Sequence, residues 1–307
     1  MISPFNLILK DCMITNVKIM NIAQRAKHMY KTYAIPKKNG GRRIIDHPAK
    51  PLKAIQRSIV SAVLRDLPVH QSCTAYEPGR SALLNAQTHQ DSRYFYQLDF
   101  KDFFHSIKHR NVSAFLESST RLDTEESEII SMICCKGDHL VIGAPSSPIL
   151  SNRIMFRFDS EATIISQSLG CIYTRYSDDI TISTKNDTTA INECIRALID
   201  FIGSPDNNWL RINEAKTRHS SLKRRVAVTG YNITNDHRPV VPRSYKRTVR
   251  ALIHKAIICN NDEIELDKVL GMVAYIEGSE PGFIESLKGK YGPEVINRLR
   301  KHNTTGH

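Results

Sequence analysis

The chain has 307 residues, 41% of them hydrophobic, which is enough for about two domains with buried cores. Its 43 Lys and Arg outnumber 31 Asp and Glu, and the net charge of +12 favours a polyanionic partner such as nucleic acid over a merely solvated basic face. Because it lacks an apolar run of ~18 residues, a secretion signal and zinc-ligand spacing among its seven Cys, we expect a cytoplasmic protein with reduced thiols, no structural zinc and no membrane partner.

In the first half of the chain, a basic hairpin stands between predicted helices. Residues 32–48 contain Asn39-Gly40, a favoured two-residue turn pair, between apolar residues typical of strands. The basic residues in and beside this hairpin are Lys31, Lys37, Lys38, Arg42, Arg43 and Lys50. Apolar spacing predicts helices over 16–30, 52–67, 111–118 and 124–135, and an aromatic-rich strand over 93–100 that contains Asp99.

The second half of the chain changes from strands to helices. A Gly, Pro and Ser loop from residue 142 is expected to become a helix near Pro148, with Ser147 as its N-cap. "CIYTRYS" and "DITIS" predict two short strands, and "VAVTGYNIT" (226–234) predicts another that turns through Asn235-Asp236 into "RPVV". An amphipathic helix is expected over 187–202. Helices follow from about 243, so we place a domain boundary near 236–243.

Two adjacent aspartates, Asp178 and Asp179, interrupt the strand pattern with like charges. Taken alone, they indicate a solvated turn, since Asp is common in turns. If the strand that ends at Asp99 is their neighbour, three carboxylates converge and repel one another. Two divalent cations would remove this repulsion, because Mg²⁺ prefers oxygen ligands and two metals can clamp an in-line phosphoryl displacement. The pattern therefore predicts a metal-dependent site for phosphoryl transfer.

Several segments, in this order, resemble motifs of the reverse transcriptase family: "YQLDFKDFF" (96–104), "IGAPSSPILSN" (142–152), "YSDD" (176–179) and "LRINEAKT" (210–217). The resemblance implies an α+β, right-hand polymerase fold with an antiparallel palm sheet and a helical thumb. It also implies an RNA-directed DNA polymerase that uses two Mg²⁺ ions, with Mn²⁺ as a possible substitute. Fingers are expected over 1–93 and 107–141, the palm over 94–106 and 142–236, and the thumb over 237–307.

The resemblance also implies roles for individual residues of the polymerase site. Asp99 and Asp178 would be the main metal ligands, with Asp179 and the backbone carbonyl of Phe100 contributing, and Lys216 would assist the leaving pyrophosphate. The residues expected to bind the incoming dNTP are Lys38 (or Lys37), Arg43, Gly143, Ala144 and Phe104, whose ring would exclude a 2′-hydroxyl. Ile142 stands where the family usually has Gln, which leaves the contact of this position with the nucleotide open.

Two further elements, "NAQTH" (85–89) and "VTG" (228–230), resemble sequences typical of bacterial retron reverse transcriptases. That resemblance implies a cognate structured noncoding RNA (msr-msd), DNA synthesis primed by a guanosine 2′-hydroxyl, and multicopy single-stranded DNA (msDNA) as the product. It also implies an effector protein from a neighbouring gene and a role in antiphage defence. The expected RNA contacts are Asn85, His89, Val228, Thr229, Gly230, Arg243, Lys246, Arg247 and Arg250.

Two alternatives stay open at this point. One is another prokaryotic reverse transcriptase, of the group II intron or diversity-generating type, which would lack the combination of "NAQTH" and "VTG". The other is a catalytically idle RNA-binding scaffold, against which the intact Asp99, Asp178 and Asp179 argue. Basic helical surfaces suit RNA and protein partners alike, so the oligomeric state is also open.

Overall fold

The computed structural model describes residues 3–36, 40–257 and 265–297, and the chain divides into two units. Unit 1 comprises Met1–Ser81 and Phe95–His219, and unit 2 comprises Ala82–Tyr94 and Ser220–His307. This division groups residues 82–94 with the C-terminal part. The fingers, palm and thumb boundaries stay a prediction. No helix of the described ranges is long and apolar enough to cross a membrane.

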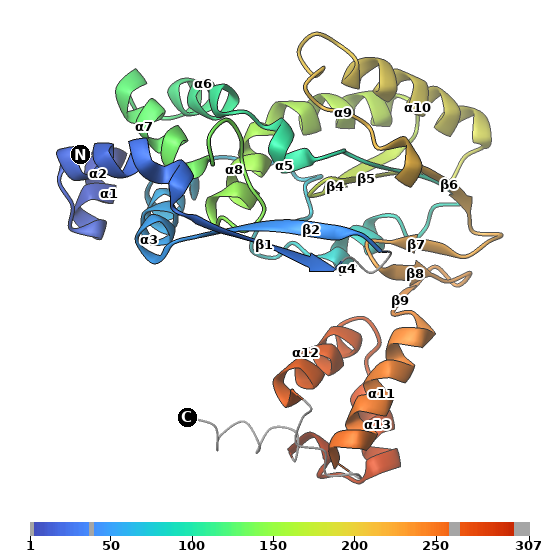
Figure 1. Cartoon of the computed structure of the whole chain (residues 1–307). Helices are drawn as coiled ribbons and strands as arrows, with labels where there is room; N and C mark the ends of the chain where they lie inside the picture. The colour runs from blue at the N-terminus through green and yellow to red at the C-terminus, as the bar shows by residue number, and fades with distance from the viewer. Residues whose placement is uncertain (1–2, 37–39, 258–264, 298–307) are drawn as a thin grey trace. The chain divides into compact units, whose positions relative to one another are not determined.

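A helical layer forms the N-terminal part of unit 1 (Figure 1). Three of its helices begin at side chains that cap backbone amides: Ser3 accepts from Asn6, Thr15 from Lys18, and Asp123 from Glu126. Their apolar faces bury residues such as Ile8, Ile19 and Leu52 completely. The elements are α1 (Pro4–Cys12), α2 (Asn16–Arg25), η1 (Ala26–His28), α3 (Lys50–Ile59), η2 (Val60–Leu64), α6 (His109–Ser119) and α7 (Thr124–Cys134).

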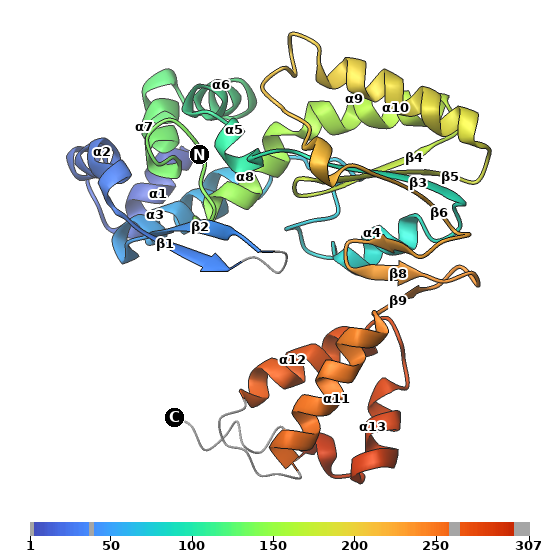
Figure 2. The same ribbon diagram turned by 45° about the vertical axis from the view of Figure 1, so that its right-hand side comes forward.

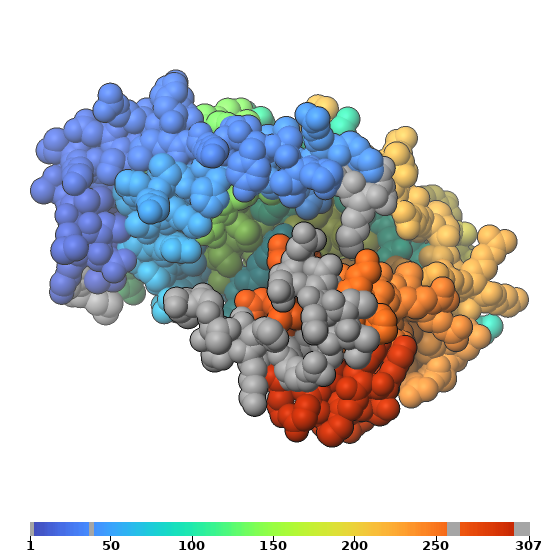
Figure 3. All heavy atoms as spheres, turned by 60° about the horizontal axis from the view of Figure 1, so that its bottom comes forward, coloured from blue at the N-terminus to red at the C-terminus, as the bar shows by residue number. Residues whose placement is uncertain are grey.

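The predicted basic hairpin is confirmed as β1 (Tyr30–Pro36) and β2 (Arg42–Pro48), which pair antiparallel. The described pairing runs from Tyr30 opposite Pro48 to Pro36 opposite Arg42, and the predicted two-residue turn at Asn39-Gly40 stays a prediction. Lys37, Lys38 and Asn39 lie outside the described residues. The N-terminal helices and the hairpin share one continuous face of unit 1, drawn in blue in Figure 3.

A four-stranded sheet in the order β4-β5-β3-β6 is the centre of unit 1. Helices α9 and α10 lie side by side over one face of it, as both ribbon views show (Figures 1 and 2). The strands are β3 (Tyr94–Asp99), β4 (Ile172–Tyr176), β5 (Asp179–Thr184) and β6 (Arg218–Ser221). The associated helices are α5 (Phe103–Ser106), α8 (Ser146–Ile154), α9 (Phe156–Ser168), α10 (Thr188–Ile202) and η3 (Glu214–Lys216).

Unit 2 contains helix α4 (Ala82–Thr88), a three-stranded antiparallel sheet and the C-terminal helices. The sheet consists of β7 (Val226–Val228), β8 (Tyr231–Ile233) and β9 (Pro239–Val240). The predicted helices from about 243 are confirmed as α11 (Arg243–Ile257), α12 (Leu266–Glu277) and α13 (Phe283–Tyr291). Val249, Val269 and Leu287 are fully or almost fully buried among them.

Two local predictions are wrong. Helix α8 begins at Ser146 after Pro145 and has no side-chain cap, and Ser147 lies inside the helix, where its Oγ accepts from the Val141 amide at 3.4 Å. The stretch 226–234 is two strands rather than one. Thr229 and Gly230, with φ of 46° and 92°, turn the chain back between β7 and β8, which glycine favours because it has no Cβ.

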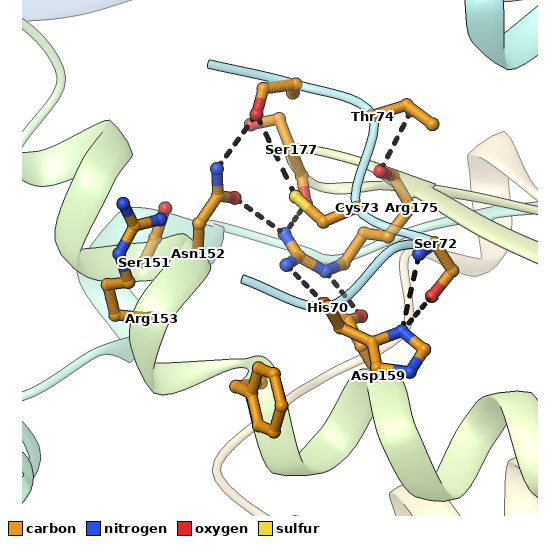
Figure 4. A network of polar contacts seen from close by, with 12 residues as sticks. His70, Ser72, Cys73, Thr74, Ser151, Asn152, Arg153, Asp159, Arg175 and Ser177 are labelled. Atoms are coloured by element: carbon orange, nitrogen blue, oxygen red, sulfur yellow. Dashed lines mark hydrogen bonds and ion pairs between the residues drawn. The ribbon is translucent and has the colours of Figure 1, made fainter. Parts of the chain in front are cut away.

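A buried ion pair joins α9 to the central sheet (Figure 4). Arg175 of β4 and Asp159 of α9 are both 0% exposed, and the guanidinium donates to the carboxylate through Nε (2.8 Å) and Nη2 (2.6 Å). The Tyr173 hydroxyl donates to the same carboxylate at 2.8 Å. Burial disfavours the charge of Arg175, but the neighbouring carboxylate outweighs it and raises the pKa of the guanidinium.

Replacing Asp159 with Asn should destabilise the protein strongly, because it leaves a buried guanidinium without its counter-charge. We expect Asp159→Asn to lower the free energy of unfolding by about 3–5 kcal/mol, measured by denaturant titration. The matched control is Asp138→Asn, which breaks the exposed 3.1 Å pair with Lys108 and should change stability little. Equal effects of the two substitutions would contradict this view of the buried pair.

Candidate active site

Three carboxylates meet where the central strands of unit 1 end. Asp99 is the last residue of β3, Asp179 is the first residue of β5, and Asp178 lies in the turn between β4 and β5. Strands β3 and β5 are neighbours, and the Phe100 amide donates to the Asp178 carbonyl at 2.9 Å. The sequence prediction that the acidic pair occupies a hairpin turn beside the strand of Asp99 is therefore confirmed.

The carboxylates perturb one another, as expected for like charges in a partly desolvated site. Desolvation and the charge of Asp99 raise the pKa of Asp178. Desolvation, the charges of Asp178 and Asp99 and a hydrogen bond with Asp99 raise the pKa of Asp179 to about 7, with Lys216 acting in the opposite direction. Near neutral pH, these carboxylates are therefore partly protonated, and a cation could displace the proton.

Lys216 and Asn213 hold Asp99 from the segment around η3. The Lys216 ammonium donates to Oδ2 of Asp99 at 2.7 Å, and the Asn213 amide nitrogen donates to Oδ1 at 3.1 Å. Partial burial opposes the charge of Lys216, but Asp99 outweighs it and raises the pKa of the lysine. Sequence reasoning identified Lys216 and missed Asn213, although both belong to "LRINEAKT".

The oxygen atoms of this site suit a hard divalent cation, with substrate completing the coordination. No group of three or more His, Cys, Asp or Glu in the described ranges is arranged as a ready metal site. Mg²⁺ does not require three such side chains, because one or two carboxylates commonly bind it together with substrate phosphates. Asp99 and Asp178 supply the carboxylates. The backbone carbonyl of the buried Phe100 accepts no hydrogen bond from the described residues, so its oxygen is a further candidate metal ligand.

A pocket of about 430 Å³ opens beside the carboxylates. Arg43 of β2 and Phe104 of α5 line it together with Asp99 and Asp178, so the structure brings these predicted residues together. The pocket is also lined by Ile142, where the family usually has Gln. Lys38 lies outside the described residues.

Gly143 and Ala144 are absent from the lining of this pocket. Ala144 is buried, and Gly143 lies so close to β2 that a Cβ would meet the Asp46 carbonyl at 2.7 Å. Its φ of 120° also favours glycine. The structure thus gives Gly143 a packing role beside β2, and its predicted contact with dNTP stays a prediction.

The turn that carries Asp178 is fixed from the buried side. Arg175 donates through Nη1 to the carbonyl of Ser177 at 3.0 Å, and Ser177 adopts a left-handed conformation with φ of 61° (Figure 4). The Tyr76 hydroxyl donates to Oγ of Ser177 at 2.9 Å. Sequence reasoning missed Arg175 and Tyr76, because no local pattern shows that two distant segments meet at this turn.

The two retron-like elements lie together inside unit 2. Asn85 of α4 is fully buried and its amide donates to Oγ1 of Thr229 at 3.5 Å, while the Thr229 hydroxyl donates to the Ala82 carbonyl at 2.7 Å. His89 and Val228 are also fully buried. The expectation that Asn85, His89 and Val228 contact RNA directly is not supported, because their side chains are packed inside the unit.

Helix α11 presents the basic side chains expected to bind RNA. Arg243 and Arg247 are exposed, and neither has an ion-pair partner in the described ranges. Lys246 pairs with Glu280 at 2.6 Å, and Arg250 lies 4.9 Å from the centre of the Phe283 ring. These side chains line a concave region of about 460 Å³ on unit 2, where Glu280 is the acidic residue and pairs with Lys246.

Comparisons with known proteins agree with this geometry. The family described as reverse transcriptase (RNA-dependent DNA polymerase) matches residues 35–233. The retron Ec83 reverse transcriptase of Escherichia coli is 32% identical over 289 residues, which cover 90% of this chain and 91% of that protein. The retron Ec73 reverse transcriptase of the same species is 34% identical over 295 residues, covering 89% and 90%.

Among solved structures, telomerase from Candida albicans in complex with the TWJ fragment of telomeric RNA has a TM-score of 0.54. The sequences are 10% identical, and the match covers 89% of this chain and 56% of the telomerase chain. At this identity the similarity concerns the fold, and it is consistent with the predicted right-hand polymerase architecture.

Replacing Asp179 with Asn should stabilise the metal-free protein, because it removes a carboxylate from a crowded site. The native pKa of about 7 lies above the ordinary value of 3.8, so the wild type loses stability as pH rises through this range. We expect Asp179→Asn to raise the melting temperature at pH 8 in EDTA, with a gain that shrinks towards pH 4. Glu161→Gln, on an exposed position of α9, should show no such trend. A pH-independent effect would contradict the repulsion.

His89 should make the stability of unit 2 dependent on pH. Complete burial lowers its pKa from 6.5 to about 3, so below pH 6.5 the unfolded chain binds a proton that the native state excludes. Stability should therefore fall between pH 6.5 and 3, by up to about 1.4 kcal/mol per pH unit. Unfolding midpoints of His89→Asn should depend less steeply on pH, whereas the exposed His28→Asn should match the wild type. Parallel slopes for all three would exclude this role.

Proposed function

The chain belongs to the reverse transcriptase family and, within it, to the retron reverse transcriptases, and from this premise we propose that it converts its own structured noncoding RNA into msDNA. The observation that carries the proposal is the pocket that Asp99 and Asp178 line together with Arg43 and Phe104, with Asp179 close enough to both carboxylates to be perturbed by them. RNA-directed DNA synthesis is the activity of the family. The use of a cognate RNA and of a guanosine 2′-hydroxyl as primer goes beyond this family activity and is part of what we propose.

Asp99 and Asp178 would hold two divalent cations, Mg²⁺ or Mn²⁺, with help from the Phe100 carbonyl and less direct help from Asp179. Bound metal supplies a more acidic attacking hydroxyl and neutralises charge on the phosphates. Asn213 orients Asp99 through its 3.1 Å hydrogen bond. Lys216 pairs with Asp99, but its side chain is 57% exposed. Its ammonium could therefore turn from Asp99 towards the departing pyrophosphate, where it would donate a proton or balance the negative charge of the pyrophosphate.

The pocket would select and orient the incoming nucleotide. Arg43 offers a bidentate fork to the triphosphate, and Lys38 is expected to add a point charge. Phe104 is half-buried at the pocket wall, where its ring would leave no room for a ribose 2′-hydroxyl. Gly143 and Ala144 would act through their backbone, because neither carries a polar side chain.

Helix α11 would bind a stem of the noncoding RNA. Phosphate and 2′-hydroxyl contacts dominate recognition of RNA helices, and the exposed Arg243 and Arg247 suit them. Lys246 and Arg250 lie beside them and would add weaker contacts. Of the "VTG" element, the exposed Gly230 and the half-buried Thr229 are the positions from which RNA could be contacted. We place the reaction in the cytoplasm and expect an effector protein that makes msDNA part of an antiphage defence.

The direct test is DNA synthesis by the purified protein bound to its own noncoding RNA. We expect dNTP incorporation that needs Mg²⁺ and yields DNA joined to RNA through a 2′,5′ bond. Asp178→Asn should abolish synthesis and leave RNA binding intact, because Asp178 lies in the pocket rather than on α11.

The matched control reverses that pattern. The double variant Arg243→Ala/Arg247→Ala should bind RNA more weakly and with a smaller salt dependence, since two phosphate contacts are lost. It should still extend a short DNA primer on a generic RNA template when both are in excess. Absence of Mg²⁺-dependent incorporation by the wild type on its own RNA would overturn the proposed function.

A further inference from the structure

Tyr76 holds a backbone conformation that tyrosine rarely adopts. Its φ is 64°, in the left-handed region, which costs a residue with a Cβ roughly 1–2 kcal/mol. Tyr76 is 42% exposed and lines the same pocket as Asp99 and Asp178. Strain of this kind persists only where the surrounding structure imposes it, and it gathers at functional sites.

The segment before Tyr76 is fixed to the elements that carry the catalytic turn. The Thr74 amide donates to the Arg175 carbonyl at 2.8 Å, and the Asn152 side chain donates to the Ala75 carbonyl at 2.8 Å. Arg175 in turn donates to the carbonyl of Ser177 (Figure 4). Tyr76 is therefore held in register with the turn by its own neighbours, so its hydroxyl has a defined position.

That hydroxyl acts on Ser177, the residue before Asp178. Tyr76 donates to Oγ of Ser177 at 2.9 Å, so the hydrogen of the serine hydroxyl is left to donate elsewhere. Burial and the charge of Asp99 raise the pKa of Asp178, and the Ser177 hydroxyl opposes them as a donor close to that carboxylate. A tyrosine hydroxyl is protonated near neutral pH, and burial raises the pKa of Tyr76 further, so the hydroxyl is available as a donor. The result is a chain of donors that runs from Tyr76 through Ser177 to the carboxylate of Asp178.

We propose that Tyr76 is a positioning residue for nucleotide transfer: its hydroxyl orients the Ser177 hydroxyl, which keeps the Asp178 carboxylate turned towards the pocket. The proposal rests on the metal-binding role of Asp178 in the proposed function. It explains why a strained position beside the site carries a tyrosine, whose rigid ring sets its hydroxyl at a fixed distance. A purely structural tyrosine would need only its ring.

The test removes the hydroxyl and keeps the ring. Tyr76→Phe should lower kcat by about 2- to 10-fold, as expected for one hydrogen bond, and raise the Mg²⁺ concentration for half-maximal activity by a similar factor. The KM for dNTP should stay unchanged, because Arg43 and Phe104 are untouched. Ser177→Ala should give the same result. The double variant should be no worse than either single variant, because both break one chain of donors.

A second readout needs no turnover. Mg²⁺ should raise the melting temperature of Tyr76→Phe less than that of the wild type at equal concentration. Tyr291→Phe, which loses a 3.1 Å hydrogen bond from its hydroxyl to the Arg250 carbonyl in unit 2, should respond to Mg²⁺ as the wild type does.

The proposal is overturned if Tyr76→Phe has the wild-type Mg²⁺ requirement and Mg²⁺-induced shift, or if the effects of Tyr76→Phe and Ser177→Ala multiply in the double variant. If the wild type incorporated no dNTP, the proposed function would fail. The Mg²⁺-induced shift of the two tyrosine variants would still decide the role of Tyr76.

Discussion

The buried pair of Arg175 and Asp159 is the interaction on which the site depends. A buried ion pair of this kind contributes little net stability compared with apolar packing, but it permits few alternative arrangements. Here the guanidinium makes two bonds to Asp159 and has a further nitrogen for the Ser177 carbonyl, so one rigid group joins α9, β4 and the turn. The left-handed backbone of Ser177 is therefore imposed by a contact that cannot easily shift.

The exposed side of the same turn carries negative charge that the protein only partly balances. Three carboxylates lie together there. Among the described residues, Lys216 is the cation that pairs with one of them, Asp99, while burial and mutual repulsion raise the pKa values of Asp178 and Asp179. Such a site is unfavourable on its own and becomes favourable when it binds positive charge. A rigid support beneath an electrostatically unsatisfied surface is the arrangement that preorganised catalysis requires, because the ligands need not reorganise when substrate and metal arrive.

The sequence predicted the parts of this arrangement that depend on local patterns. The aromatic-rich run 93–100 and the short runs "CIYTRYS" and "DITIS" located β3, β4 and β5, and the pair Asp178 and Asp179 marked the turn between the last two. Reasoning failed where distant segments decide the outcome. An arginine is ordinarily exposed, so nothing local indicated that Arg175 is buried. Thr229 has a β-branched side chain, which favours strands, so the sequence did not indicate the turn between β7 and β8. The resemblance to retron sequences implied RNA contacts for Asn85 and His89, whereas tertiary packing places both side chains inside unit 2.

The carboxylates of Asp99, Asp178 and Asp179 are expected to share a proton near neutral pH and to release it when they bind metal. Calorimetric titration of the purified protein with Mg²⁺ at pH 7, in buffers of different ionisation enthalpy, measures this release directly. With a pKa of about 7 at Asp179, we expect about half a proton to be released per protein molecule at saturation with Mg²⁺. A variant with both Asp178→Asn and Asp179→Asn should release none. Mg²⁺ binding without proton release, or with the same release in the double variant, would contradict this coupling of metal binding to deprotonation.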